Sequence, residues 1–244
     1  MKSVGIIPAR YASTRFPGKP LALIGDKTMI QRVYEQAVQS KLDKVYVATD
    51  DQRILEHVTS FGGKAILTSP GHPSGTDRCC EALYKIDEGY EVVLNIQGDE
   101  PFINPSLLNQ LVDCFADKET SIATPAKIIE HQKDIFSPNV VKVVKDNNST
   151  ALYFSRSAIP NIRNAAGDNW IEHHSFYSHV GIYAFRSSVL KKLVQLPQHP
   201  LEIAESLEQL RWLANGYKIR IIETNYSNIS VDTPEDLAKA AGLL

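Results

Sequence analysis

The chain reads VGIIPARYASTRFPGKPL over residues 4–21. The apolar run at residues 4–7 is typical of a buried strand. The loop that follows carries three cations, Arg10, Arg15 and Lys19, with two hydroxyls, a glycine and three prolines. Cations that leave one strand end together can surround a polyanion such as a triphosphate. The glycine allows close approach of the backbone to a ligand, and the prolines restrict the loop. We therefore expect an anion site here.

Two familiar phosphate-binding patterns do not fit this loop. The usual phosphate loop needs a glycine five residues before Gly-Lys and a Ser or Thr after it, but Ser13 and Pro20 stand there. No Gly-x-Gly-x-x-Gly follows the strand, so the dinucleotide pattern is absent too. The remaining alternative is a solvated, basic connection without a ligand.

The composition excludes several classes of protein. The 244 residues are 43% hydrophobic and carry a formal net charge of −2, so no general basic field is available for nucleic acid. The three cysteines, Cys79, Cys80 and Cys114, lack the spacing of a disulfide framework or a zinc site. We recognise no signal peptide and no apolar run of membrane-spanning length. A soluble, cytoplasmic protein with no membrane or nucleic-acid partner is expected.

Strand and helix patterns alternate in the first half, as in a wound, mostly parallel sheet. We expect strands at residues 44–49, 64–67 and 91–96, and helices at 29–38, 51–61, 76–87 and 105–115. The spacing of Ile30, Val33, Ala37 and Val38 would turn them toward the sheet. Thr76 or Asp77 could cap the third helix. Ligands of such sheets bind outside the carboxyl ends of the strands, where the first loop lies.

The pattern changes near residue 120. The turn at residues 146–149 favours a hairpin that pairs Val143-Val144 with Leu152-Tyr153. Further expected elements are strands at 122–125, 180–185 and 218–223, helices at 202–214 and 234–241, and a mobile loop at 164–169. We find no linker or repeat, and therefore expect one domain over residues 1–244. Its halves would be 1–120 for the nucleotide and 121–244 for the acceptor.

Two carboxylates stand at the ends of expected elements. Asp99 lies in Gln97-Gly98-Asp99-Glu100-Pro101, after the 91–96 strand, and Asp232 precedes the closing helix. Such a pair facing a cationic loop suits Mg²⁺, which often takes one or two carboxylates and completes its shell with phosphate and water. Alternatively, Asp99 could belong to a turn and Asp232 could be a helix cap.

Other polar groups also lie at element ends. The Ser74–Arg78 segment could read a base edge or begin a capped helix, and Asp50-Asp51 could be a cap or a ligand contact. In the second half, Arg156, His179 and Tyr183 are polar groups near the ends of expected elements. Glu208 and Gln209 could bind sugar hydroxyls or merely solvate a helix face. A metal pair at His173-His174 is not expected, because adjacent side chains on regular structure point in different directions.

Together these segments resemble the 3-deoxy-manno-octulosonate (Kdo) cytidylyltransferase family. The resembling segments run in order along nearly the whole chain, at residues 7–21, 47–51, 74–78, 95–101, 151–156, 179–183, 207–211 and 231–237. Each segment is weak alone, and the ordered set is specific.

The resemblance implies a fold, a reaction and an assembly. The fold would be a Rossmann-like α/β nucleotidyltransferase, with a mostly parallel central sheet, helices on both faces and a smaller β-rich part for the acceptor and dimerisation. The reaction would be CTP with Kdo and Mg²⁺, giving CMP-Kdo for lipopolysaccharide biosynthesis, and pyrophosphate. A homodimer is implied. The alternatives are a related acceptor, either an amino-Kdo analogue or sialic acid, and a non-catalytic nucleotide-sensing module.

The resemblance also implies residue roles. Arg10, Lys19 and Asp99 would be catalytic, and Asp99 and Asp232 would hold Mg²⁺. The nucleotide would be bound by Arg10, Ser13, Arg15, Lys19, Ser74, Gly75, Thr76, Arg78 and Gln97. The sugar acid would be surrounded by Arg156, His179, Tyr183, Glu208 and Gln209. The general base stays open between Asp99 and a metal-bound route.

Overall fold

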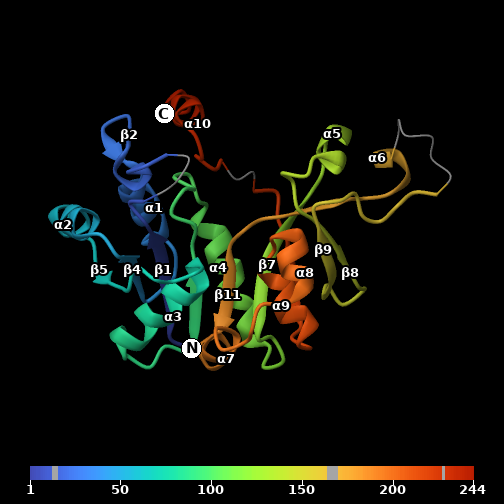
Figure 1. Cartoon of the computed structure of the whole chain (residues 1–244), viewed down its shortest axis with the longest axis horizontal. Coiled ribbons are helices and arrows are strands. Elements are labelled where there is room, and N and C mark those ends of the chain that lie inside the picture. Colours follow the sequence, from blue (N-terminus) through green and yellow to red (C-terminus); the bar gives the residue numbers. More distant parts are fainter. Residues whose placement is uncertain (13–15, 164–169, 227–228) are drawn as a thin grey trace. The chain divides into compact units, whose positions relative to one another are not determined.

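The computed structural model describes residues 1–12, 16–163, 170–226 and 229–244. The chain forms two compact units (Figure 1). The first consists of Met1–Asp113, Ala184–Val194 and Asn228–Leu244, and the second of Cys114–Tyr183 and Gln195–Ser227. Each unit thus combines separate stretches of chain, and the functional halves 1–120 and 121–244 stay a prediction. The loop expected at 164–169 lies outside the described residues. None of the described helices has the length and apolar composition needed to span a bilayer.

The first unit is built on a mostly parallel sheet. Its strands lie in the order β5 (Ala65–Leu67), β4 (Lys44–Thr49), β1 (Ser3–Ala9), β6 (Val92–Asn95) and β11 (Tyr183–Arg186). β1 pairs in parallel with both β4 and β6, and β4 with β5. Val4, Ile6 and Ile7 of β1 are fully buried, as a central strand requires. The predicted wound, mostly parallel sheet is confirmed.

Helices alternate with these strands, and the sequence predicts all of the α-helices below except α7. They are α1 (Met29–Ala37), α2 (Gln52–Ser60), α3 (Gly75–Ile86), α4 (Pro105–Asp113), α7 (Ser187–Leu193) and α10 (Pro234–Ala241), with short 3₁₀ turns η1 (Lys19–Leu21) and η2 (Cys114–Ala116). Two details of the prediction are wrong. Val38 is 47% exposed, because it falls off the stripe of Ile30, Val33 and Ala37. The cap of α3 is Ser74, whose extended backbone lets its Oγ accept the N–H of Asp77.

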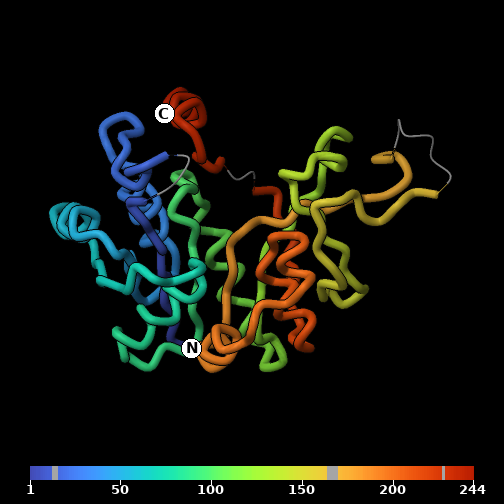
Figure 2. The backbone as a smooth tube through the Cα atoms, in the orientation of Figure 1, coloured from blue at the N-terminus to red at the C-terminus, as the bar shows by residue number. Residues whose placement is uncertain are grey.

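The end of the chain packs against its beginning within the first unit. The hairpin β2 (Leu23–Ile24) and β3 (Lys27–Thr28) follows the first loop, and α10 lies beside it (Figure 1, Figure 2). A buried cluster of Ile24, Met29, Val231 and Ala240 joins the two segments. This packing fixes Asp232, next to Val231, beside the first loop.

The second unit is mainly antiparallel. β7 (Ile122–Ile128), β10 (Tyr177–His179), β8 (Lys142–Lys145) and β9 (Ala151–Ser155) are neighbours in that order, and β12 (Ile219–Glu223) pairs in parallel with β7. The predicted hairpin is confirmed by the pairing of Val144 with Tyr153. The helices are α5 (Gln132–Phe136), α6 (Trp170–His173), α8 (Pro200–Glu205) and α9 (Gln209–Ala214).

Two elements expected in the second half are interrupted. The strand at 180–185 is replaced by β10, a turn and β11, because the N–H of Ile182 bonds back to the carbonyl of Val180. The helix at 202–214 is two helices, because Ser206 adopts a left-handed backbone (φ 51°) that ends α8. Glu208 therefore immediately precedes α9 rather than lying in mid-helix.

Candidate active site

A pocket of about 480 Å³ lies at the carboxyl ends of the strands of the first unit. Its lining residues come from the end of β1, the first loop, the start of α3 and the segment after β6, and are Pro8, Ala9, Arg10, Ala12, Lys19, Pro20, Pro73, Ser74, Gly75, Gln97, Gly98 and Asp99. We call it the first-unit pocket. Five of the predicted nucleotide-binding residues, Arg10, Lys19, Ser74, Gly75 and Gln97, thus lie together around one cavity.

Lys19 joins the two predicted carboxylates. Its Nζ lies 2.8 Å from Asp99 Oδ2 and 3.2 Å from Asp232 Oδ1. The Lys19 side chain is only 14% exposed, so water screens these pairs less than it would on the surface. The backbone also joins the segments, since the N–H of Val231 donates to the carbonyl of Asp99. Asp99 and Asp232 lie 80 and 213 positions after Lys19 in the chain, and the fold brings both to this one cation.

The alternative role of Asp232 as a helix cap is not adopted. Thr233 is the N-cap of α10, and its side chain accepts the N–H of Asp236. The carboxylate of Asp236 accepts the N–H of Thr233 in return, which completes a capping box. Asp232 is therefore left to face Lys19.

The donor set fits a divalent metal that arrives with a phosphate ligand. Asp99 and Asp232 supply hard carboxylate oxygens, which Mg²⁺ prefers. Among the residues that the structure describes, no group of three or more His, Cys, Asp or Glu could hold a metal. Two carboxylates alone leave most of an octahedral shell to phosphate and water, as in nucleotide-dependent magnesium sites.

Glycines allow the walls of the pocket to approach each other. A Cβ at Gly98 would lie 2.9 Å from the carbonyl oxygen of Pro8, and one at Gly75 would lie 3.3 Å from Pro8 Cγ. Gly18 has a φ of +73°, and a Cβ there would lie 3.2 Å from the ring of Tyr11. The close approach at Gly98 thus involves the end of β1 itself.

Two predicted nucleotide-binding residues lie away from the pocket lining. The Arg78 side chain is fully buried, with Nη2 3.3 Å from Asp50 Oδ2 and Nη1 donating to Thr68 Oγ1 at 2.6 Å. Thr76 is 2% exposed. Their contact with a nucleotide stays a prediction. Ser13 and Arg15 lie outside the described residues.

The structure also distinguishes the two neighbouring aspartates at the end of β4. Asp51 is the N-cap of α2, with its Oδ1 accepting the N–H of Arg53 at 2.9 Å, and Asp50 pairs with Arg78. The Asp50–Arg78 pair was not predicted. Its only signal in the sequence is that each residue belongs to a polar segment at an element end.

In the second unit, His179 and Tyr183 are neutral groups in contact. Their ring centroids are 5.2 Å apart. The hydroxyl of Thr124 donates to the carbonyl of Ile182 at 2.7 Å, so it accepts the Nε2–H of His179 at 2.9 Å. Burial lowers the pKa of His179 to about 3. Burial, and then the charge of Glu208, raise the pKa of Tyr183 well above its usual value. Both side chains can hydrogen-bond a hydroxyl without adding charge.

Arg156 is a fixed cation in the same unit. Its Nε donates to the carbonyl of Glu205 at 2.7 Å and its Nη1 to that of Pro138 at 3.0 Å. The Glu205 carboxylate accepts the N–H of Arg156 at 2.9 Å, and the buried Lys142 donates to the Arg156 carbonyl at 2.5 Å. Lys142 and Glu205 were not singled out from the sequence, because a lysine in a strand normally lies at the surface.

Glu208 and Gln209 complete the predicted acceptor residues. Glu208 Oε1 accepts from Arg211 Nη2 at 2.8 Å. Gln209 is 4% exposed, and its Nε2 has no hydrogen-bond partner among the described residues. A buried amide donor without a partner is costly, so a bound hydroxyl would relieve it. Gln209 thus does not merely solvate a helix face.

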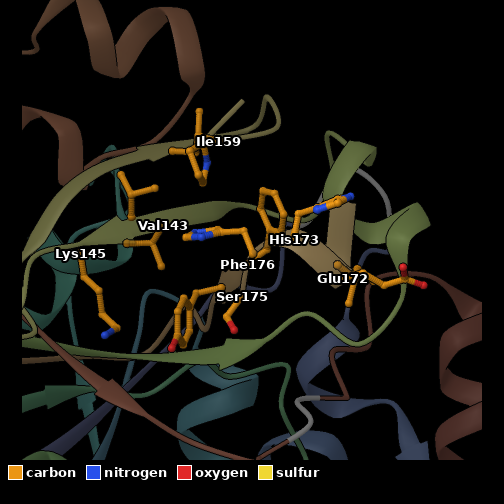
Figure 3. Close-up of a pocket in the computed structure, with 12 residues that line it drawn as sticks. Val143, Lys145, Ile159, Glu172, His173, Ser175 and Phe176 are labelled. Atoms are coloured by element: carbon orange, nitrogen blue, oxygen red, sulfur yellow. The ribbon is translucent and has the colours of Figure 1, made fainter. Parts of the chain in front are cut away.

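A second cavity, of about 600 Å³, lies within the second unit (Figure 3). Val143 and Lys145 of β8 line it, together with Glu172, His173 and the following residues to Tyr177. His173 and His174 are exposed, and the ring of His174 meets that of Phe176 at 88°. The sequence patterns did not predict this cavity, because it depends on the packing of α6 near β8.

Comparison with known proteins first defines the class. The model of the cytidylyltransferase family matches residues 4–219, so the chain belongs to the cytidylyltransferase family. A solved CMP:2-keto-3-deoxy-manno-octonic acid synthetase complexed with CTP is 44% identical, with a TM-score of 0.93, and the match covers 100% of this chain and 98% of that one. The predicted nucleotidyltransferase fold is confirmed.

Two full-length relatives then show where the chain belongs within the cytidylyltransferase family. A 3-deoxy-manno-octulosonate cytidylyltransferase from Parabacteroides distasonis is 57% identical over 248 residues, which cover 100% of this chain and 98% of that protein. The enzyme of the same name from Bacteroides thetaiotaomicron is 56% identical, with the same coverage. Within the family, this chain therefore belongs with the 3-deoxy-manno-octulosonate cytidylyltransferases, and the predicted resemblance is confirmed.

Proposed function

We propose that the chain transfers CMP from CTP to the anomeric hydroxyl of Kdo, forming CMP-Kdo and pyrophosphate for lipopolysaccharide biosynthesis. The observation that carries this proposal is the ion pairing of Lys19 with Asp99 and Asp232 beside a cavity walled by Arg10, Ser74 and Gly98. Full-length relatives that carry the name of this enzyme support the choice of substrates.

The chemical step forms one oxygen–phosphorus bond and breaks another. The anomeric oxygen of Kdo attacks the α-phosphorus of CTP, the bond to the pyrophosphate oxygen breaks, and the hydroxyl proton leaves to a base. Lys19 and Arg10 neutralise the triphosphate and hold it in line for attack. Positioning and fixed charge account for most of the acceleration in this class of reaction.

Asp99 and Asp232 are the residues that would hold Mg²⁺. When bound, Mg²⁺ supplies positive charge that lowers the repulsion between an anionic nucleotide and an anionic sugar acid. Asp99 also remains a candidate for the general base, as does a metal-bound route.

The second unit offers the acceptor a cation, a carboxylate and neutral hydrogen-bonding groups. We assign Arg156 to the acceptor carboxylate, and His179, Tyr183, Glu208 and Gln209 to its hydroxyls. The partnerless Nε2 of the buried Gln209 supports this assignment. A related sugar acid, either an amino-Kdo analogue or sialic acid, is the second candidate acceptor.

Pyrophosphate release tests the proposal. The purified chain is incubated with Mg²⁺, each of the four common nucleoside triphosphates, and Kdo, an amino-Kdo analogue or sialic acid. We expect release only with CTP, and fastest with Kdo. Turnover without preference for CTP, or none with Kdo, would contradict the substrate assignment. CTP binding without turnover on any acid would instead support a nucleotide-sensing module.

We also propose a homodimer formed through the second unit, in the cytoplasm. Five apolar side chains of this unit are at least 40% exposed: Ile128, Phe136, Leu152, Leu201 and Ile203. Exposed apolar side chains that lie together are typical of a protein–protein interface.

A further inference from the structure

Arg10 is held by the loop between β5 and α3, residues 68–74. Its Nη2 donates to the carbonyl oxygen of His72 at 2.6 Å. Because a guanidinium has several N–H donors in a fixed plane, one bond to a backbone carbonyl sets where the others point. The direction of Arg10 into the first-unit pocket therefore depends on the position of His72.

His72 is in turn held by Glu81, from the second turn of α3. Glu81 Oε2 bonds His72 Nε2 and also accepts the N–H of Ser69 at 2.9 Å. One carboxylate oxygen thus fixes the start and the middle of the loop. His72 and Glu81 are both absent from the residues that line the pocket. They can act on a bound nucleotide only through their neighbours.

Glu81 is charged whenever the protein is folded near neutral pH. Burial by itself would raise its pKa, but hydrogen bonds from Lys85, His72 and the N–H of Ser69 lower it to about 2. An ionised carboxylate only accepts hydrogen bonds, so His72 donates through Nε2–H. Charge-assisted bonds of this kind are stronger than neutral ones, which makes Glu81 an effective anchor.

The ends of the loop have separate anchors. Thr68 N–H bonds the carbonyl of Thr49 at 2.7 Å, and Ser74 caps α3. Between them, Glu81 is the side chain of α3 that bonds both Ser69 and His72. From this chain of contacts we propose that Glu81 and His72 are positioning residues, which orient Arg10 for the triphosphate of CTP. The inference rests on the proposed function.

A simpler role for Glu81 is its pair with Lys85 one helical turn later. Lys85 Nζ and Glu81 Oε1 are 2.8 Å apart, and the Lys85 side chain is 49% exposed. Exposed pairs with this spacing contribute little to stability. Lys85→Gln removes that pair, together with the bond from Lys85 Nζ to the carbonyl of Leu67 at 2.8 Å. It leaves both bonds from Glu81 to the loop in place, so it is the matched control for Glu81→Gln.

The test measures KM for CTP and for Kdo, with the unfolding midpoint as a check on the fold. We expect Glu81→Gln to raise KM for CTP about tenfold, the effect of losing one charge-assisted hydrogen bond, with KM for Kdo unchanged. Lys85→Gln should leave both values unchanged. In an Arg10→Lys background, Glu81→Gln should have no further effect, because the two residues act through one contact.

Two results would overturn the proposal: an unchanged KM for CTP in Glu81→Gln, or the same tenfold rise in the Arg10→Lys background. If Glu81→Gln does not fold, His72→Leu decides. It removes the bond to Glu81 but keeps the backbone carbonyl, and an unchanged KM for CTP would then contradict positioning. A wild-type protein that releases no pyrophosphate from CTP and Kdo would contradict the proposed function instead, and CTP binding by calorimetry would still test the positioning.

Discussion

Lys19 is the residue on which the proposed reaction depends most. It contacts both carboxylates and lines the pocket. Its removal would take away a positive charge that neutralises the triphosphate, and would leave Asp99 and Asp232 without this shared cation. We expect Lys19→Ala and Asp99→Ala each to lower kcat by about two or more orders of magnitude, the scale of losing a central electrostatic contact. Steady-state pyrophosphate release measures this.

The control for Lys19→Ala is Lys27→Ala. Lys27 pairs with Glu35 at 2.7 Å, and both side chains are 38% exposed. A surface pair of this kind contributes little, so kcat should be unchanged. If Asp99→Ala kept near-normal kcat, Asp99 would be excluded from the metal site.

His179 makes a separate prediction about stability. Its pKa of about 3 lies below the ordinary histidine value of 6.5, so as the pH falls the unfolded chain takes up the proton first. Stability from this group is present above pH 6.5 and is lost toward pH 3. Between pH 7 and pH 5 the wild type should lose about 2 kcal/mol more unfolding free energy than His179→Gln. Urea unfolding at several pH values measures the difference, and parallel pH profiles would show that His179 is not held neutral.

At the scale of elements, the pocket depends on the contact between the ends of β1 and β6. In Gly98→Ala the new methyl group would meet the carbonyl of Pro8 at 2.9 Å, so the backbone must move. We expect a loss of about 1–3 kcal/mol in unfolding free energy, with weaker CTP binding. Gly71→Ala is the control, since its nearest neighbour would be Ser69 Oγ at an ordinary 3.7 Å. Equal unfolding midpoints for the two variants would contradict the close approach.

The sequence predicts elements well where the signal is local. The run at residues 4–7 became β1, and the turn at 146–149 became the hairpin of β8 and β9. Ser206 gave no such signal, because a left-handed backbone is usually adopted by glycine or asparagine and not by serine. The break between α8 and α9 was therefore not predicted. The same holds for Arg78: its burial against Asp50 is decided by how α3 lies on the sheet, not by neighbouring residues.

At the scale of the whole molecule, the proposed homodimer can be tested by light scattering. Leu152 is 61% exposed in the second unit, and Leu67 is 46% exposed in the first. We expect Leu152→Asp to shift the protein toward monomer, because a buried charge without a partner is costly at an interface. Leu67→Asp should leave the mass unchanged. A wild-type monomer at micromolar concentration would contradict the dimer.

Contacts between segments far apart in the chain were the hardest feature to predict from the sequence. Asp99 and Asp232 were paired as a hypothesis on chemical grounds, and the structure places them on one ammonium group. That residues 184–194 join the first unit could not be inferred from the periodicity of those residues. It depends on contacts between segments far apart in the chain.

The placement of Lys19 has a consequence for the order in which ligands enter. The Lys19 ammonium is the counter-ion of both carboxylates, at the place where the proposed Mg²⁺ would bind. On the proposed function, a metal ion would compete with Lys19 for Asp99 and Asp232, and the phosphates of CTP would give Lys19 another partner. We therefore expect Mn²⁺ to bind the free protein weakly, and Lys19→Met to bind it more tightly, by electron paramagnetic resonance. Metal and nucleotide would then bind cooperatively. The phosphates would draw Lys19 away from the carboxylates, and the carboxylates would become free to bind the metal.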